Sequence, residues 1–229
     1  GVLQLIKMDR YVDLIVPRGG EGLIRFVSEN ATVPVIKHDK GLCHTYIDKD
    51  AIIDNGINIA LNAKVQRPGV CNSMETLLVD KSIAEQILPK LKKVFDDANT
   101  QLKGCVETRN IIPIDTADEE DFNTEYLANI LNIKVVEGVE GAINHIVKYG
   151  SGHSEAIITE NITTAEYFLN SIDAAAVYVN ASTRFTDGGE FGFGAEVGIS
   201  TNKLHARGPM GVEGLTTYKF KIYGKGQTR

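Results

Sequence analysis

Short apolar runs alternate with longer amphipathic segments along most of the chain, and this alternation constrains the fold more than any other feature of the sequence. Apolar residues recur at helical spacing in the segments 23–27, 52–64, 83–95, 139–147 and 163–170. The apolar runs that we expect to form strands are residues 12–16, 33–36, 43–47, 76–79, 133–136, 156–159 and 175–179. Strands joined by helices need crossover connections, so the sequence predicts an α/β fold with a largely parallel sheet that helices cover on both faces.

Two segments lack this regular period. Residues 103–126 are polar and acidic, and we expect a solvated connection there. Residues 179–214 are dense in glycine and also carry aromatic and charged side chains. A loop of this length inside a compact domain is usually functional or disordered, and its aromatic and charged residues favour the ordered wall of a binding site.

The composition is that of a soluble globular protein. The 229 residues are 43% hydrophobic and 24% charged, and the formal net charge is −6. This acidic balance argues against general nucleic-acid binding, which needs clustered Lys and Arg. No apolar window approaches the length of a membrane span, and we expect no signal peptide and no membrane partner.

The three cysteines, Cys43, Cys71 and Cys105, bear on both chemistry and compartment. Their odd number and the lack of CxxC or Cys/His spacing predict neither a disulfide framework nor a metal site. We therefore expect a cytoplasmic protein, in a reducing environment where a free thiol can react. Cys43 lies in an alternating strand and Cys105 beside a loop, so both are interpreted as structural cysteines.

Cys71 differs from the other cysteines in its local sequence. It follows a bend at Pro68 and Gly69 and precedes two polar residues, Asn72 and Ser73. A lone cysteine is most often a small buried hydrophobic residue, but a tight bend presents free backbone N–H groups near the sulfur. Such groups favour a thiolate and stabilise an oxyanion beside it, so Cys71 is the candidate nucleophile.

A glycine-rich turn is the second candidate site. The sequence PRGGEG, with Gly19, Gly20 and Gly22, follows an apolar run and precedes a helical segment, where a backbone can approach a phosphate. It is not the GxGxxG fingerprint, and an ordinary strand-to-helix turn remains an alternative. Together with Cys71, the turn suggests acyl-thioester chemistry coupled to hydride transfer. A cysteine hydrolase is the competing hypothesis; its histidine would be one of the five in the chain, none of them in a recognisable setting.

Five motifs carry a resemblance to a known family. They are VDLIVPRGGEGLIRFV, NAKVQRPGVCNSMETLLVD, YGSGHSEAIITEN, VYVNASTRFTDGGEFGFGAEVGIST and KLHARGPMGVEGLTTYKF. Together they resemble the γ-glutamyl phosphate reductases, a divergent branch of the aldehyde dehydrogenase superfamily, over essentially the whole chain. The resemblance implies the three-layer α/β fold of aldehyde dehydrogenases. It also implies the NADPH-dependent reduction of L-glutamyl 5-phosphate to glutamate 5-semialdehyde, with release of phosphate, in proline biosynthesis.

The resemblance also implies roles for individual residues. Cys71 matches the nucleophile that forms a thioester, Glu125 the glutamate that holds the nicotinamide ribose, and Gly19 with Gly20 the turn at the cofactor phosphates. For Glu125, an exposed carboxylate at a helix start is the alternative. The substrate carries a carboxylate and a phosphate, so cations must converge on it. The substrate-binding candidates are Arg67, Asn72, Asn180, Arg184, Lys203, His205 and Arg207, with Ser182 as a further polar contact.

The chain departs from the wider superfamily in two ways. Ile36 aligns loosely with the glutamate base of hydrolytic aldehyde dehydrogenases, and without that base a thioester should survive long enough to be reduced. Full members of the family also have an N-terminal portion of comparable size, which supplies most of the cofactor-binding sheet. If the chain acts without it, we expect a folded catalytic domain with weak or no NADPH binding.

The expected organisation follows from the resemblance. Residues 1–48 complete the cofactor-binding region, residues 49–212 form the catalytic domain, and residues 213–229 form an exposed strand. An exposed edge strand needs a partner, so we expect a homodimer or a higher homo-oligomer in which it pairs across subunits. Association with a glutamate kinase, as in bifunctional relatives, is a further expectation. Two alternatives remain open: a thiol-dependent dehydrogenase of another semialdehyde, and a catalytically silent domain.

Overall fold

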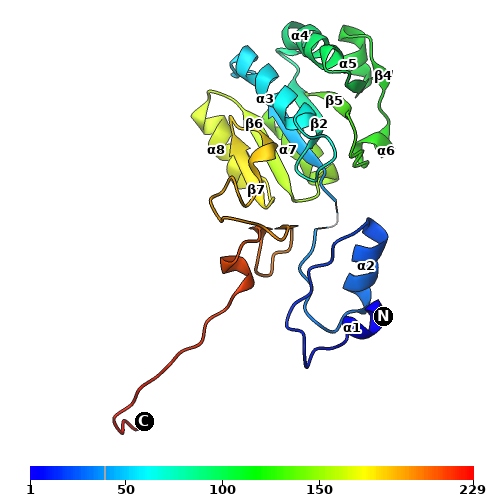
Figure 1. Ribbon diagram of the computed structural model, residues 1–229. Helices are drawn as coiled ribbons and strands as arrows, with labels where there is room; N and C mark the ends of the chain where they lie inside the picture. Colours follow the sequence, from blue (N-terminus) through cyan, green and yellow to red (C-terminus); the bar gives the residue numbers. More distant parts are fainter. Residues whose placement is uncertain (39) are drawn as a thin grey trace.

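A seven-stranded parallel sheet forms the body of the protein (Figure 1). The computed structural model describes residues 1–38 and 40–229. The strands lie in the order β4-β3-β5-β2-β1-β6-β7, and all neighbouring pairs are parallel. Their bounds are β1 Cys43–Ile47, β2 Met74–Asp80, β3 Gln101–Gly104, β4 Asp115–Thr116, β5 Ile130–Val136, β6 Ser154–Ile158 and β7 Ala176–Val179. The predicted α/β class and parallel sheet are confirmed.

Helices cover both faces of this sheet, as the sequence predicts. On one face pack α3 (Ile53–Val65), α4 (Ala84–Asp97) and α5 (Val106–Ile111), and on the other α7 (Gly138–Tyr149) and α8 (Ile162–Ser171). Successive residues of a strand point to opposite faces. In β2, Leu77 and Val79 accordingly join the core under α3 and α4, whereas Leu78 joins the core under α7 and α8.

The segment 103–126 is more regular than its polar sequence predicts. It contains the end of β3, then α5, β4 and α6 (Glu119–Phe122). The side chain of Asp118 caps α6 by accepting hydrogen bonds from the backbone of Glu120 and Asp121. Phe122 is buried. The prediction of an irregular solvated connection was therefore wrong, because one cap and one buried ring order a segment that is otherwise acidic.

A smaller N-terminal lobe lies beyond the edge of the sheet (Figure 1). It contains α1 (Val2–Leu5) and α2 (Glu21–Asn30). The expected strands at 12–16 and 33–36 form only one parallel bridge, between Ile15 and Val35. The prediction of two strands was wrong here, since two short extended runs without further neighbours cannot build a ladder of hydrogen bonds.

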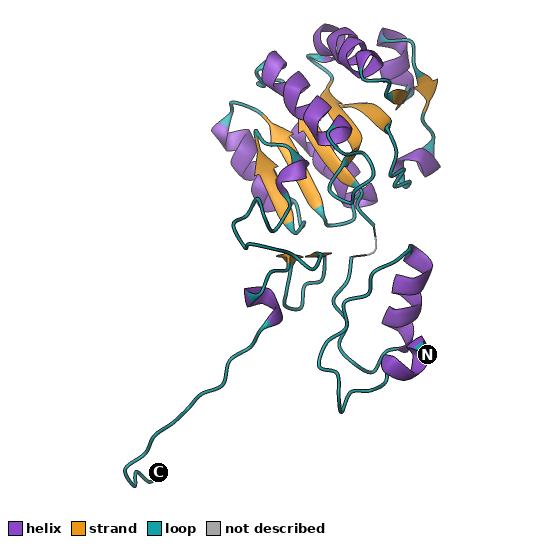
Figure 2. Ribbon diagram, in the orientation of Figure 1, coloured by secondary structure: helices purple, strands orange, loops and turns teal. Residues whose placement is uncertain are grey.

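The chain after β7 is mostly loop (Figure 2). Residues 180–215 contain the short helices η1 (Thr183–Phe185) and η2 (Glu213–Leu215) and an antiparallel pair, β8 (Ile199–Ser200) with β9 (Gly208–Pro209). From residue 216 the chain extends away from the body as an arm without secondary structure, and its apolar side chains are exposed. The expected C-terminal strand is therefore not formed within the described single chain. Among the described residues, none of the helices combines the length and apolar character that crossing a membrane requires.

Candidate active site

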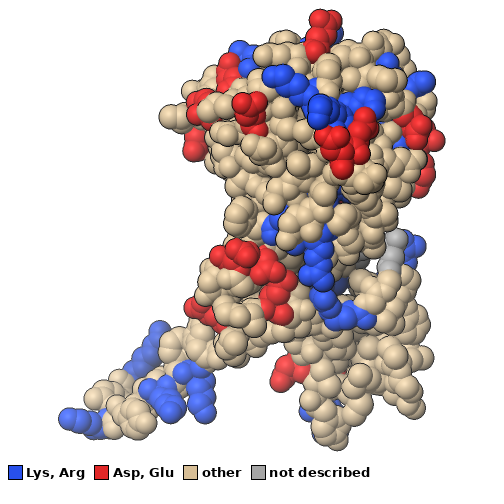
Figure 3. All heavy atoms as spheres, turned by 45° about the horizontal axis from the view of Figure 1, so that its top comes forward, with Lys and Arg blue, Asp and Glu red and all other residues tan. Residues whose placement is uncertain are grey.

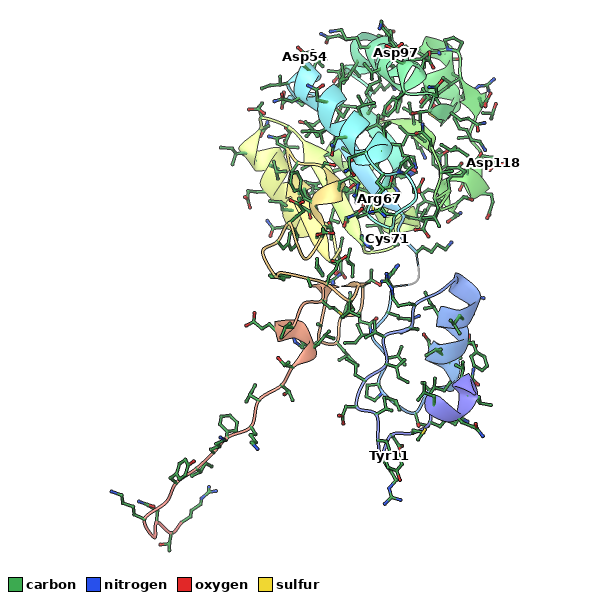
Figure 4. All side chains as sticks on the ribbon, viewed as in Figure 1. Tyr11, Asp54, Arg67, Cys71, Asp97 and Asp118 are labelled. Atoms are coloured by element: carbon green, nitrogen blue, oxygen red, sulfur yellow. The ribbon has the colours of Figure 1, made fainter. Side chains whose placement is uncertain are left out.

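Cys71 lies at the end of the sheet where the central strands begin, in the loop that precedes β2. The loop 66–73 joins the end of α3 to the start of β2, and β1, β5 and β6 also start at this end. In Figure 4, Cys71 and Arg67 lie at this end, facing the N-terminal lobe, and Asp54 lies at the opposite end of α3. The fold therefore presents the bend seen in the sequence to the space between the two parts of the molecule.

Cys71 lines two cavities that also share Gly19, Ile24 and His38. The first has a volume of about 440 Å³ and contains the side chains of Arg18, Arg67 and Arg184; we call it the arginine cavity. The second has a volume of about 420 Å³ and contains Gly19, Gly20, Lys40 and Glu125; we call it the glutamate cavity. Cys71 is thus the cysteine that lines both cavities.

Side chains of both positive and negative charge line the arginine cavity. Arg18, Arg67 and Arg184 face it together with Asp187 and Glu196. Figure 3 shows basic side chains gathered at the waist between the sheet and the N-terminal lobe, with acidic side chains beside them. Three guanidinium groups against two carboxylates leave an excess of positive charge, which suits an anionic ligand.

Asn72 fixes one wall of this cavity. Its buried amide donates to the carbonyl oxygen of Thr186 (2.9 Å), and its side-chain oxygen accepts from Arg184. Thr183 donates to the backbone oxygen of Asn72 (2.7 Å), and Arg184 Nε donates to Gln66 (2.9 Å). The side chain predicted to bind substrate is therefore engaged in joining the Cys71 loop to the turn 183–186, and it also lines the cavity.

β1 and the residues just before it pack against the backbone of Cys71. A Cβ on Gly41 would lie only 2.0 Å from the carbonyl oxygen of Cys71, so this position requires glycine. The thiol of Cys43 donates to the same carbonyl oxygen at 3.3 Å. Cys43 is fully buried, which confirms its interpretation as a structural cysteine. Cys105 lies far along the chain, at the start of α5, where its sulfur shares a hydrogen bond with Thr108 (3.2 Å).

The thiol of Cys71 is not activated by its surroundings. Burial, with Glu125 and Glu196, raises the pKa of Cys71 to about 11, although its own backbone N–H and Arg18 act in the opposite direction. The prediction that the bend would favour a thiolate was therefore wrong. The backbone N–H expected from the sequence is present, but two carboxylates and desolvation outweigh it.

The structure separates four predicted residues from Cys71. Lys203 and Arg207 both form ion pairs with Asp173, which follows α8. His205 lines a different cavity, beside Phe193. The side-chain amide of Asn180 is hydrogen-bonded to the backbone of Thr159. None of these residues lines the arginine or the glutamate cavity, and Ser182 caps η1 rather than facing either of them.

Conversely, sequence reasoning missed several residues that line the cavities. Arg18 lies within the PRGGEG turn, for which only the glycines were predicted to bind a ligand. Asp187 and Glu196 lie in the glycine-rich segment 179–214. His38 lines both cavities. Ile36, taken to replace a catalytic base, is instead buried against Ala206 and Met210 and lines neither cavity. Among the described residues, no group of three or more His, Cys, Asp and Glu side chains is arranged to hold a metal.

The sheet order and the helical layers define the fold class. The fold is that of the aldehyde dehydrogenases: an acetylating aldehyde dehydrogenase from Geobacillus thermoglucosidasius superposes with a TM-score of 0.65 at 23% identity, over 82% of this chain and 50% of that one. The γ-glutamyl phosphate reductase of Thermotoga maritima matches with a TM-score of 0.96 at 52% identity, over 100% of this chain and 55% of that one. The resemblance to γ-glutamyl phosphate reductases is therefore confirmed.

Curated relatives give the same result. The chain is 80% identical over its 229 residues to the γ-glutamyl phosphate reductase of Sulfurovum sp. and 74% identical to that of Sulfurimonas denitrificans. It spans 56% of the length of each of these relatives. No family model matches the chain.

Proposed function

We propose that this chain is the cysteine-bearing part of a cytoplasmic enzyme of proline biosynthesis that reduces L-glutamyl 5-phosphate to L-glutamate 5-semialdehyde with NADPH and releases phosphate. The high identity to γ-glutamyl phosphate reductases supports the reaction. The observation that carries the proposal is the position of Cys71 in the lining of two adjoining cavities, one rich in arginine and the other bearing Glu125.

In this proposal the arginine cavity binds the substrate. L-Glutamyl 5-phosphate carries an α-carboxylate and a phosphate, and guanidinium groups bind both through paired hydrogen bonds. Arg67 comes from the Cys71 loop itself, Arg184 from η1 and Arg18 from the N-terminal lobe. Arg67 and Arg18 are both exposed, whereas Arg184 already donates to Gln66 and Asn72.

The residues of the glutamate cavity fit a nicotinamide cofactor. Glu125 offers a carboxylate for ribose hydroxyl groups, and Gly20 caps the N-terminus of α2 without a side chain to exclude a phosphate. When bound, NADPH supplies the hydride that reduces the thioester. The chain's own residues would hold the ribose at Glu125 and the acyl group at Cys71.

Cys71 performs the covalent step. Its thiolate attacks the γ-acyl carbon, the carbon–oxygen bond to the phosphate breaks, and the phosphate leaves with the electron pair of that bond, so that a thioester remains on Cys71. After reduction, the sulfur departs again and the aldehyde is released. Lysine, histidine and arginine residues bound elsewhere, such as Lys203 and Arg207 at Asp173, take no part in this scheme.

Replacement of Cys71 in the full-length protein tests the function. The assay follows NADP⁺ reduction with glutamate 5-semialdehyde and phosphate, the reverse reaction, alongside a panel of other semialdehydes. We expect Cys71→Ala to lose at least about a thousandfold in kcat. Cys105→Ala is the matched control and should keep its activity, since Cys105 lies at the start of α5. Residual activity of Cys71→Ala near that of the control, or a preference for another semialdehyde, would contradict the proposal.

We further propose that the arm 216–229 pairs with a second copy of the chain. Its exposed apolar side chains, Tyr218, Phe220 and Ile222, alternate with Lys219 and Lys221, which is the pattern of a strand with one apolar face. Unpaired strand groups favour association with another strand. Deletion of the arm should convert an oligomer into a monomer in sedimentation measurements, and an unchanged mass would contradict this assignment.

A further inference from the structure

A buried ion pair closes the base of the Cys71 loop. Lys64 lies next to the end of α3 and Glu75 is the second residue of β2, so the loop 66–73 begins and ends at these two side chains. Lys64 Nζ donates to Glu75 Oε2 at 2.7 Å. The exposed fractions of the two side chains are 0% and 1%. The pair therefore fixes the distance between the two ends of the loop that carries the thiol.

The second oxygen of Glu75 reaches a different loop. Glu75 Oε1 accepts a hydrogen bond from the backbone N–H of Leu127 at 3.3 Å. Leu127 has a φ of 50°, a conformation that a leucine adopts only when its surroundings impose it. Glu125 precedes it by two residues and lines the glutamate cavity. One carboxylate thus contacts both the cysteine loop and the loop that carries Glu125.

The two loops also touch directly. A Cβ on Gly69 would lie 3.4 Å from the carbonyl oxygen of Leu127, so the backbone of the cysteine loop packs against this residue. Lys40 donates to the carbonyl oxygen of Asn123 at 3.1 Å and holds the other end of the same segment. The hydroxyl of Tyr126, the residue next to Glu125, is hydrogen-bonded to Asp121 and Asn132. The bond to Glu75 is therefore one of several contacts that set the position of Glu125 relative to Cys71.

Stability alone is a poor explanation for this ion pair. Removing two charges from water opposes their mutual attraction, and buried pairs can often be replaced by apolar residues without loss of stability. Burial raises the pKa of Glu75 to about 7 and lowers the pKa of Lys64, which shows how strongly the site disfavours charge. A pair kept in such a place is better explained by the geometry that it imposes.

We propose that Lys64 and Glu75 are positioning residues, which hold the nucleophile Cys71 and the cofactor-side residue Glu125 at a fixed separation. Glu75 contacts both loops, and Lys64 donates to the carboxylate oxygen that Leu127 does not use. The inference rests on the proposed function for the roles of Cys71 and Glu125. The contacts of Glu75 themselves do not depend on it.

Two neutral double variants of the full-length protein test the proposal. Lys64→Met with Glu75→Gln removes both charges but keeps an oxygen that can accept from Leu127 N–H. Lys64→Met with Glu75→Leu removes the charges and the acceptor together. Lys81→Met with Glu137→Gln is the control, because this pair is exposed to solvent. Should the leucine variant fail to fold, Glu75→Met replaces it, with a side chain nearer to glutamine in shape.

Two readouts separate positioning from a general structural role. Hydrogen exchange of the Leu127 amide should be faster in the variant without an acceptor, and its kcat should fall by about tenfold to a hundredfold, as expected for a misplaced reacting group. The control should retain the wild-type exchange and activity. The glutamine variant should retain the wild-type exchange of the Leu127 amide but lose part of its kcat, less than the variant without an acceptor, because it keeps the bond to Leu127 and lacks the bond to Lys64. Equal kcat in the two double variants would overturn the proposal, whether or not the exchange rates differ. Because exchange is measured without turnover, a failure of the proposed reaction would be recognised separately, by activity in Cys71→Ala.

Discussion

The charged and buried surroundings of Cys71 predict a slow reaction of its thiol with alkylating reagents. Burial, Glu125 and Glu196 raise its pKa from 9.0 to about 11. Two pKa units correspond to about 2.7 kcal/mol of preference for the neutral thiol, or about a hundredfold less thiolate at a pH below both values. Because only the thiolate is nucleophilic, alkylation at neutral pH should be about a hundredfold slower than for an unperturbed thiol.

Iodoacetamide labelling as a function of pH measures this directly. Mass spectrometry of peptides distinguishes Cys71 from Cys43 and Cys105, and the rate at Cys71 should rise about tenfold per pH unit up to its pKa. Replacing either neighbouring carboxylate, by Glu125→Gln or Glu196→Gln, removes a charge that opposes the thiolate. Each variant should therefore be labelled faster than the wild type at the same pH.

A carboxylate far from Cys71 provides the control for this experiment. Glu213→Gln changes an exposed carboxylate in η2 and should leave the rate unchanged. A wild-type profile with its inflection at or below 9.0, the ordinary value, would refute the interpretation that burial and the two glutamates suppress ionisation. Wild-type rates in both glutamine variants would refute the electrostatic part alone.

Three further predictions concern single side chains. Gly41→Ala places a Cβ against the carbonyl of Cys71, so the protein should lose on the order of 1–3 kcal/mol or more in denaturant unfolding; unchanged stability would show that the loop can move. Arg67→Met removes an exposed cation of the arginine cavity and should raise KM for the acyl phosphate about tenfold or more, with a smaller change in kcat, in steady-state assays; an unchanged KM would exclude Arg67 from substrate binding. Asp173→Asn breaks the surface pairs with Lys203 and Arg207. It should change the free energy of unfolding by no more than about 0.5 kcal/mol and leave kcat/KM unaltered. A large loss of activity would show that these two cations contribute to the active site.

Several features of the site could be predicted from the sequence because their causes are local. Pro68 and Gly69 impose a bend, and the structure places Cys71 directly after it, in the lining of two cavities. Arg67 and Arg184 share the arginine cavity with Cys71, as the motifs led us to expect. Cys71 and Arg67 lie in the short loop between α3 and β2, so their positions follow from the elements on either side, and Arg184 lies in η1, a few residues after β7.

The other candidates failed because charged loop residues have no period to interpret. Lys203 and Arg207 belong to the same motif-rich region as Arg184, but the chain turns between them, and Asp173 from a different connection binds both. Arg18 reaches the arginine cavity from the N-terminal lobe. The packing of segments distant in sequence decides which cation pairs with which carboxylate. Amino-acid composition does not predict this pairing.

The parallel α/β sheet, the helices on its faces and the bend at Cys71 follow from local patterns, because backbone periodicity and turn chemistry act over a few residues. The raised pKa of Cys71 depends on tertiary packing, since burial and the charges of Glu125 and Glu196 reach it from different segments. Tertiary packing also decided that Lys64, at the end of a helix with ordinary spacing, is buried against Glu75. Electrostatic surroundings are a property of three-dimensional packing, and no local pattern encodes them.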